Sequence, residues 1–141
     1  MAGYSGTPLV RKLGIAPDSA VLLDGAPDGF ALDGLPPGVR LARRAGRGPY
    51  DVILCFCTDQ ARLRRRWPAL HRLTTPAGAL WVAWPKRASG VPTDLDENVV
   101  RAHALANGRV DVKVCAVDDT WSGLRLCLRK ELRQGRSTAA G

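Results

Sequence analysis

Apolar runs separated by polar segments recur along this 141-residue chain, and two of them are apolar without alternation. These runs, residues 50–57 and 79–84, lack the period of a half-exposed strand, so they predict central strands covered on both faces. Shorter apolar runs predict two further strands, at residues 20–24 and 39–41.

Three segments carry the spacing and the end signals of helices. Residues 7–14 begin with a threonine and a proline and end at a glycine that suits a left-handed stop. A second helix follows Asp59 or the threonine before it, either of which can cap it. The third is expected to begin at Thr93, with an aspartate three residues later in a capping-box-like position, and to end at residues 107–108.

The last two apolar runs alternate strictly, at residues 110–116 and 124–128, and a short polar link joins them. This pattern predicts a C-terminal antiparallel hairpin. The order of strands and helices before it predicts an α/β protein with a three-layer, Rossmann-like (methyltransferase-like), mostly parallel sheet of about six strands. Residues 1–133 are expected to form a single domain, and the polar residues 134–141 a disordered tail.

Composition restricts the class of protein and its compartment. The chain is 45% hydrophobic and 24% charged, as in ordinary globular proteins. No apolar run approaches the roughly 20 residues that span a bilayer, and the N-terminus lacks a secretion signal. Cys55 and Cys57 lie two apart in one strand, poorly placed to bridge, and no cysteine has metal-ligand spacing. We therefore expect a cytoplasmic protein with free thiols, no metal and no membrane contact.

The net charge of +8 comes almost entirely from arginine, and its densest cluster is residues 62–66. Apolar residues recur at helical spacing through and beyond this cluster, which places most of its arginines on the solvated flanks of an amphipathic helix. A basic field can attract nucleic acid, although no aromatic interleaving or helix-turn-helix pattern accompanies it here. Nucleic-acid association therefore stays an alternative function.

Four longer segments carry a family resemblance: residues 4–9, 84–86, 89–95 and 111–124. Over residues 3–133 the chain resembles a bacterial, mainly actinobacterial, family of unknown function, which implies the Rossmann-like fold but no established activity. Shorter motifs are similar to those of S-adenosylmethionine-dependent methyltransferases: residues 22–25, 51–54 and 73–78.

The loop that would hold a nucleoside cofactor departs from the methyltransferase pattern. Such a loop uses closely spaced glycines, whereas here Pro27 stands between Gly25 and Gly29, adds bulk and removes a donor. Arg43 and Arg44 occupy the region where an acid commonly holds the ribose hydroxyls. No cofactor is therefore predicted, and S-adenosylmethionine is disfavoured.

Two alternatives to an empty cofactor loop remain open. Arg43 and Arg44 could bind a phosphate or another acidic group, since the guanidinium fork suits such anions. A divergent methyltransferase would place its cofactor between residues 24–30 and Asp59. Whether the protein is an enzyme is left open.

Topology predicts where a ligand would bind. Ligands of open parallel sheets bind beyond the carboxyl ends of the strands, and loops distant in sequence meet at that rim. We expect the ligand to be a small acidic molecule or a protein partner, bound without catalysis, with Lys86 as an anion holder or proton-transfer group. Each polar residue of the rim also suits a cap, a turn or an ion pair, and Trp121 suits packing. The expected ligand-binding residues are Asp28, Asp59, Lys86, Ser89, Asp118, Asp119 and Trp121.

Overall fold

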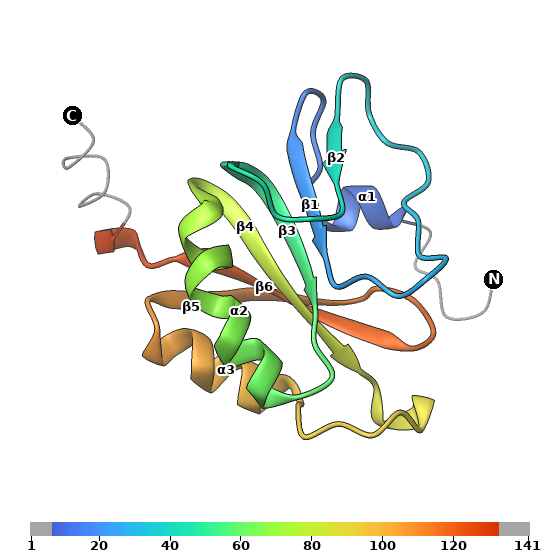
Figure 1. Cartoon of the computed structure of the whole chain (residues 1–141), viewed down its shortest axis with the longest axis vertical. Helices are drawn as coiled ribbons and strands as arrows, with labels where there is room; N and C mark the ends of the chain where they lie inside the picture. The colour runs from blue at the N-terminus through green and yellow to red at the C-terminus, as the bar shows by residue number, and fades with distance from the viewer. Residues whose placement is uncertain (1–6, 133–141) are drawn as a thin grey trace.

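The centre of the protein is strand β3, Tyr50–Phe56, in which six of seven residues are buried. The computed structural model describes residues 7–132 and arranges six strands in one sheet, in the order β2-β1-β3-β4-β6-β5 (Figure 1). The other strands are β1, Ala20–Asp24; β2, Arg40–Ala42; β4, Thr74–Pro85; β5, Arg109–Ala116; and β6, Trp121–Leu128.

The sheet is mixed, so the expected mostly parallel Rossmann-like class is wrong. Strands β2, β1, β3 and β4 pair in parallel, but the pairings of β4 with β6 and of β6 with β5 are antiparallel and join the three longest strands. The expected antiparallel pairing of the last two strands is present. A buried apolar strand looks alike whichever way its neighbour runs, so the pattern of β4 did not reveal its antiparallel side.

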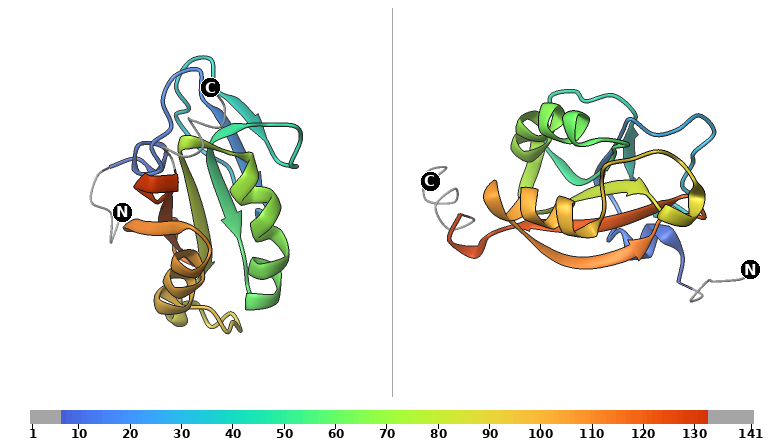
Figure 2. Two further views of the ribbon diagram at one scale, coloured as in Figure 1. Left: turned by 90° about the vertical axis from the view of Figure 1, so that its left-hand side faces the viewer. Right: turned by 90° about the horizontal axis from the view of Figure 1, so that it is seen from below.

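The expected three layers are also absent, because helices cover only one face well. Helices α2, Gln60–Leu73, and α3, Glu97–Ala106, lie on one side of the sheet, and the four-residue α1, Leu9–Lys12, lies on the other (Figure 2). No helix forms between β1 and β2. Three prolines and three glycines with positive φ in residues 26–39 keep this connection irregular.

Buried side chains form a separate core on each face. Toward α2 and α3 the core includes Ile53, Trp67 and Leu126, and toward α1 it includes Leu13, Leu54 and Trp81. The connecting segment between β1 and β2 supplies Leu32 to the second core, in place of a covering helix. The two faces of β3 therefore both lose contact with water, as its unbroken apolar sequence indicates.

Helix caps differ from expectation in one case. Asp59 caps α2 by accepting a hydrogen bond from the Arg62 amide at 2.7 Å. Helix α3 begins after Asp96, whose carboxylate accepts from the Val99 amide, so the predicted start at Thr93 is four residues too early. Thr93 instead accepts a hydrogen bond from the Leu95 amide within the preceding loop. Between β4 and this loop lies the short 3-10 helix η1, Arg87–Ser89.

Within residues 7–132 no helix is both long and apolar enough to cross a membrane. The tail predicted for residues 134–141 lies outside the described residues.

Candidate functional site

Lys86 and Trp121 lie at the same end of the sheet. The Lys86 amide donates to the Thr120 carbonyl at 2.7 Å, and Pro85 is the register partner of Trp121. Strand β6 starts where β4 ends because the two run antiparallel, so the rim carries the end of β4 and the start of β6 together. The connection from β4 through η1 to α3 borders this rim (Figure 1).

A pocket of about 650 Å³ opens at this rim, and we call it the rim pocket. Its apolar walls include Trp84, Pro85 and Leu95, and Ser122 of β6 adds a hydroxyl. The remaining lining residues are Lys86, Arg87, Gly90, Val91, Pro92, Thr93, Asp94, Asp96 and Glu97. Of the seven residues expected to bind a ligand, only Lys86 lines this pocket.

The three acidic residues of the rim pocket are bound to other groups. The Asp94 carboxylate accepts from the Gln60 amide at 2.8 Å, and Asp96 caps α3. Glu97 forms an ion pair with Arg101 one turn further along α3. Each carboxylate thus has a partner that stabilises its negative charge.

The cations of the rim pocket are not paired in this way. Within residues 7–132, neither Lys86 nor Arg87 takes part in a salt bridge. Lys86 is half-buried, and Arg87 beside it is exposed. Positive charge is therefore available to an anion at this position.

The other polar residues expected at the rim have structural contacts or lie apart from the pocket lining. Ser89 donates to the Lys86 carbonyl at 2.6 Å and accepts from the Val91 amide, which closes η1. Asp118 accepts from the amides of Thr120 and Trp121 and so closes the β5–β6 turn. Asp119 in that turn and Asp28 after β1 are exposed, and Asp59 caps α2.

Trp121 faces away from the rim pocket. Its ring forms a T-shaped contact with the ring of Phe56, with centroids 5.1 Å apart. Phe56 forms a second T-shaped contact, with Phe30, at 4.9 Å. Along β6, Trp121 and Ser122 point to opposite faces of the sheet, and Ser122 is the one that lines the pocket. The Phe30–Phe56–Trp121 cluster therefore packs the connection after β1 against the α1 side.

The place where the methyltransferase alternative would put its cofactor is filled by an ion-pair cluster. Strand order reverses between β1 and β3, and a crevice at such a point is where open sheets bind ligands. Here the buried Asp24 carboxylate, at the end of β1, accepts from Arg62 at 3.0 Å and from Arg66 at 2.8 and 3.1 Å.

Gly25 shows how tightly Arg62 fills this crevice. A Cβ atom added to Gly25 would lie 2.2 Å from Nη2 of Arg62, and Gly25 also has a φ of 72°. Nε of Arg62 donates to the Phe56 carbonyl at 2.9 Å, which fixes the guanidinium between β1 and β3. The arginine head therefore occupies the close-approach position that a cofactor would need.

The arginines of residues 62–66 are only partly solvent-exposed, whereas the sequence predicted that most of them would be. Arg64 and Arg65 are exposed, as expected, but Arg62 and Arg66 turn inward to Asp24. Their spacing of one helical turn and an aspartate ending a buried strand were the available signals. Arg43, proposed for anion binding, instead donates to the Phe30 carbonyl at 2.7 Å. Arg44 beside it is exposed.

Two buried thiols border the Asp24 cluster. Sγ of Cys55 lies 3.5 Å from Oδ2 of Asp24 and 3.5 Å from Sγ of Cys57, and both cysteines are free. The hydrogen bond between the thiols lowers the pKa of Cys57, which Arg62 lowers further, whereas the same bond and burial raise the pKa of Cys55. Of the two thiols, Cys57 therefore loses its proton more readily than Cys55.

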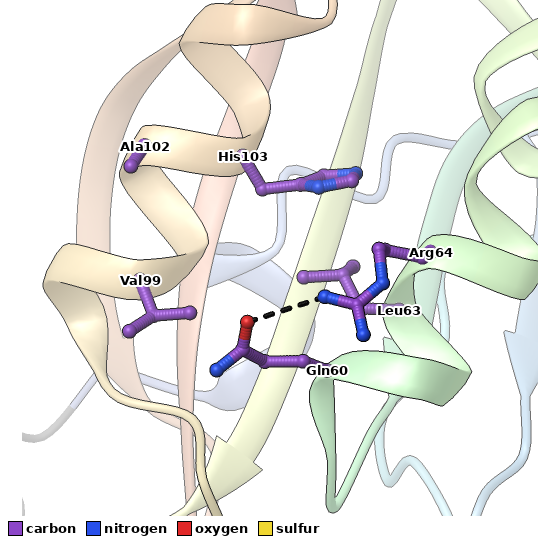
Figure 3. A pocket seen from close by; sticks show the side chains of 6 residues that line it. All are labelled: Gln60, Leu63, Arg64, Val99, Ala102 and His103. Carbon is purple, nitrogen blue, oxygen red and sulfur yellow. Dashed lines mark hydrogen bonds between the residues drawn. The ribbon is translucent and has the colours of Figure 1, made fainter.

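A second cavity, of about 340 Å³, lies between α2 and α3, and we call it the helix groove. Figure 3 shows His103 extending from α3 toward α2 above the Arg64 side chain, whose Nη1 donates to Oε1 of Gln60 at 3.3 Å. Leu63, Val99 and Ala102 form the apolar part of its lining. Gln60 also bonds Asp94, so this residue stands between the helix groove and the rim pocket.

Neither a metal-binding cluster nor a known relative assigns a function to these cavities. Within residues 7–132, no group of three or more His, Cys, Asp or Glu side chains is arranged to hold a metal ion. No protein-family model matches the chain, and no curated protein matches it.

Proposed function

We propose that the protein binds a small acidic ligand in the rim pocket without catalysing a reaction on it. Lys86 supplies the principal charge, Arg87 a second one and Ser122 a hydroxyl. The observation that carries the proposal is the imbalance of pairing within one pocket: the three acids have partners, and Lys86 and Arg87 form no salt bridge within residues 7–132.

The shape and the lining of the pocket support a small molecule of mixed character. A volume of about 650 Å³ is in the range of ordinary ligand sites. Trp84, Pro85 and Leu95 offer apolar contact, while the cations select for negative charge. A protein partner was the other expectation, and the concave form of this site favours the small ligand.

A binding role is favoured over catalysis by what surrounds Lys86. General acid–base catalysis requires a proton donor or acceptor within hydrogen-bond reach of the reacting group. The carboxylates of the rim pocket are engaged as caps or ion-pair partners, and Ser89 bonds backbone groups. These contacts support an anion holder more than a proton-transfer dyad.

The two alternative functions have less support. Arg62 and Asp24 fill the crevice that a divergent methyltransferase would use. For a nucleic-acid-associated protein, the residue 62–66 cluster offers fewer free charges than its sequence indicates, because Arg62 and Arg66 are paired. Arg64 and Arg65 are left as the exposed members of the cluster.

Calorimetry with simple anions tests the proposal. Succinate and phenyl phosphate serve as probes, with 1,4-butanediol as an uncharged control. We expect saturable binding of at least one anion and none of the diol. Lys86→Met should weaken that binding about tenfold or more, the usual worth of a lost charge-assisted contact.

Lys113→Met is the matched control, because it removes the same charge from an exposed position on β5. If Lys86→Met and Lys113→Met lost the same amount of binding, the loss would be explained by the change in net charge alone. That result would reject the rim pocket as the site. Saturable binding of neither anion would reject the proposed ligand class.

We also propose a cytoplasmic location and membership of the bacterial family that the sequence resembles. The four cysteines, all of them free, support a reducing compartment. The family proposal is supported by the sequence motifs alone, two of which, residues 84–86 and 89–95, border the rim pocket.

A further inference from the structure

The imidazole of His103 contains a polar atom that the fold does not satisfy. Its Nε2 is shielded from solvent and has no hydrogen-bond partner among residues 7–132. The ring packs edge to face against Trp67, with centroids 4.7 Å apart. An unsatisfied buried polar atom costs about 1–3 kcal/mol, so native structures keep few of them. A ligand that pairs with Nε2 would recover part of that cost.

A cation lies beside this atom on the facing helix. Arg64 is exposed and makes one side-chain hydrogen bond, to Gln60, which leaves most of its guanidinium donors available within the described chain. Its charge also contributes to lowering the pKa of His103, after the larger effect of burial. The imidazole is therefore neutral at neutral pH and can donate one N–H.

Apolar side chains complete the lining. Leu63 of α2 and Val99 and Ala102 of α3 border the space between Arg64 and His103 (Figure 3). The cavity volume of about 340 Å³ is at the small end of ligand sites. A single small molecule with an apolar body and one anionic end fits these dimensions and this distribution of charge.

We propose that the helix groove binds a small organic monocarboxylate, with its carboxylate between Arg64 and His103 and its apolar body against Leu63 and Val99. Arg64 donates to one or both carboxylate oxygens, and Nε2–H of His103 donates to the other side. Arg64 is exposed, and rotation of its side chain would admit the ligand to Nε2. This site is distinct from the rim pocket and requires no contact with Lys86.

Nuclear magnetic resonance with benzoate as the probe tests the proposal on the full chain. Benzoate should shift the His103 ring signals and the Val99 methyl signals saturably. Benzamide has the same shape without the charge, so its affinity should be lower than that of benzoate by about tenfold or more. Comparable affinity for benzamide would overturn the assignment of an anion site.

Arg64→Met should weaken benzoate binding about tenfold or more, because it removes the charged donor and keeps the helix. Arg65→Met is the matched control, since it removes an equal charge at the neighbouring exposed position that does not line the groove. Similar affinities for these two variants would contradict the proposal.

His103→Phe retains an aromatic ring beside Trp67 and removes Nε2, so it should also weaken benzoate binding. Unchanged binding in His103→Phe would remove the histidine from the site and overturn the proposed arrangement. Lys86→Met should leave benzoate binding intact, which separates this site from the rim pocket. If benzoate binding were lost in Lys86→Met and in no other variant, benzoate would bind in the rim pocket, and the proposed site in the helix groove would be wrong.

Discussion

Arg66 grips Asp24 with two nitrogens: Nη2 lies 2.8 Å from Oδ1 and Nε lies 3.1 Å from Oδ2. The residues are 42 positions apart, so the pair ties the end of β1 to the middle of α2. Arg62 adds a third bond to the same carboxylate. This cluster holds α2 over the crevice between β1 and β3. It fills the crevice that the methyltransferase alternative requires for its cofactor, whereas the proposed binding function leaves it intact.

The Asp24 carboxylate should make a large contribution to stability. Asp24→Asn keeps the size of the side chain but leaves Arg62 and Arg66 without their anion. Both guanidinium groups are partly exposed, so we expect a loss below that of a fully buried pair, about 2–3 kcal/mol in urea unfolding at neutral pH. Asp28→Asn is the control, because Asp28 is exposed in the segment that follows β1. It should change the free energy of unfolding by less than about 0.5 kcal/mol. Equal effects would show that the cluster adds little.

Gly25 should tolerate a methyl group less well than Gly29. Both have positive φ, so Gly→Ala at either position costs about 1–2 kcal/mol of backbone strain. Only Gly25 has Arg62 in the path of the new Cβ, whereas no atom lies within 4 Å at Gly29. Thermal unfolding should therefore show a lower midpoint for Gly25→Ala than for Gly29→Ala. The reverse order would mean that Arg62 does not pack against Gly25.

His103 should make the protein less stable as the solution becomes acidic. Burial and Arg64 lower its pKa in the folded state, so below the ordinary value of 6.5 the unfolded chain binds the proton more readily. Stability should fall as pH decreases from about 6.5 toward the lowered folded value, by less than about 1.4 kcal/mol per pH unit, the limit for one proton. His103→Gln should reduce this slope, measured by urea unfolding at several pH values. An unchanged slope in His103→Gln would show that His103 is not the group responsible for the loss of stability in acid.

S-adenosylmethionine should not bind. Arg62 and Asp24 occupy the end of β1, and displacing them would break three hydrogen bonds to a buried carboxylate. Calorimetry with the cofactor and with its demethylated product should therefore give no saturable heat. Micromolar binding of either compound would revive the methyltransferase alternative.

Local patterns predicted most elements of this fold but not the direction in which they pair. The unbroken apolar run around Ile53 identified the central strand, and alternation at 110–116 and 124–128 identified the final hairpin. Strand β6 inserts between β4 and β5, and a buried strand carries no signal for a parallel or antiparallel neighbour. The three-layer expectation failed because the segment after β1 is rich in proline and glycine, which the helix-crossover rule does not weigh.

The candidate site was predicted in outline only. Lys86 and Trp121 meet at one end of the sheet, as the ends of strands indicated, but Lys86 lines the rim pocket whereas Trp121 packs against Phe56. The face to which a side chain points depends on the strand register, and a register shift of one residue moves it to the opposite face. The Asp24–Arg66 pair and the contact between Gln60 and Asp94 join residues far apart in sequence. Such contacts follow from tertiary packing, and no spacing rule in one sequence encodes them.

Amide shift mapping of succinate on the isotope-labelled protein tests the central claim most directly. A ligand at the rim pocket should perturb the amides of Ser122 and of the non-proline residues within 84–97 in a saturable way, and Lys86→Met should suppress these shifts. Saturable shifts centred instead on residues 24–30 and Asp59, with residues 84–97 unaffected, would place the ligand in the crevice between β1 and β3 and contradict the proposed site.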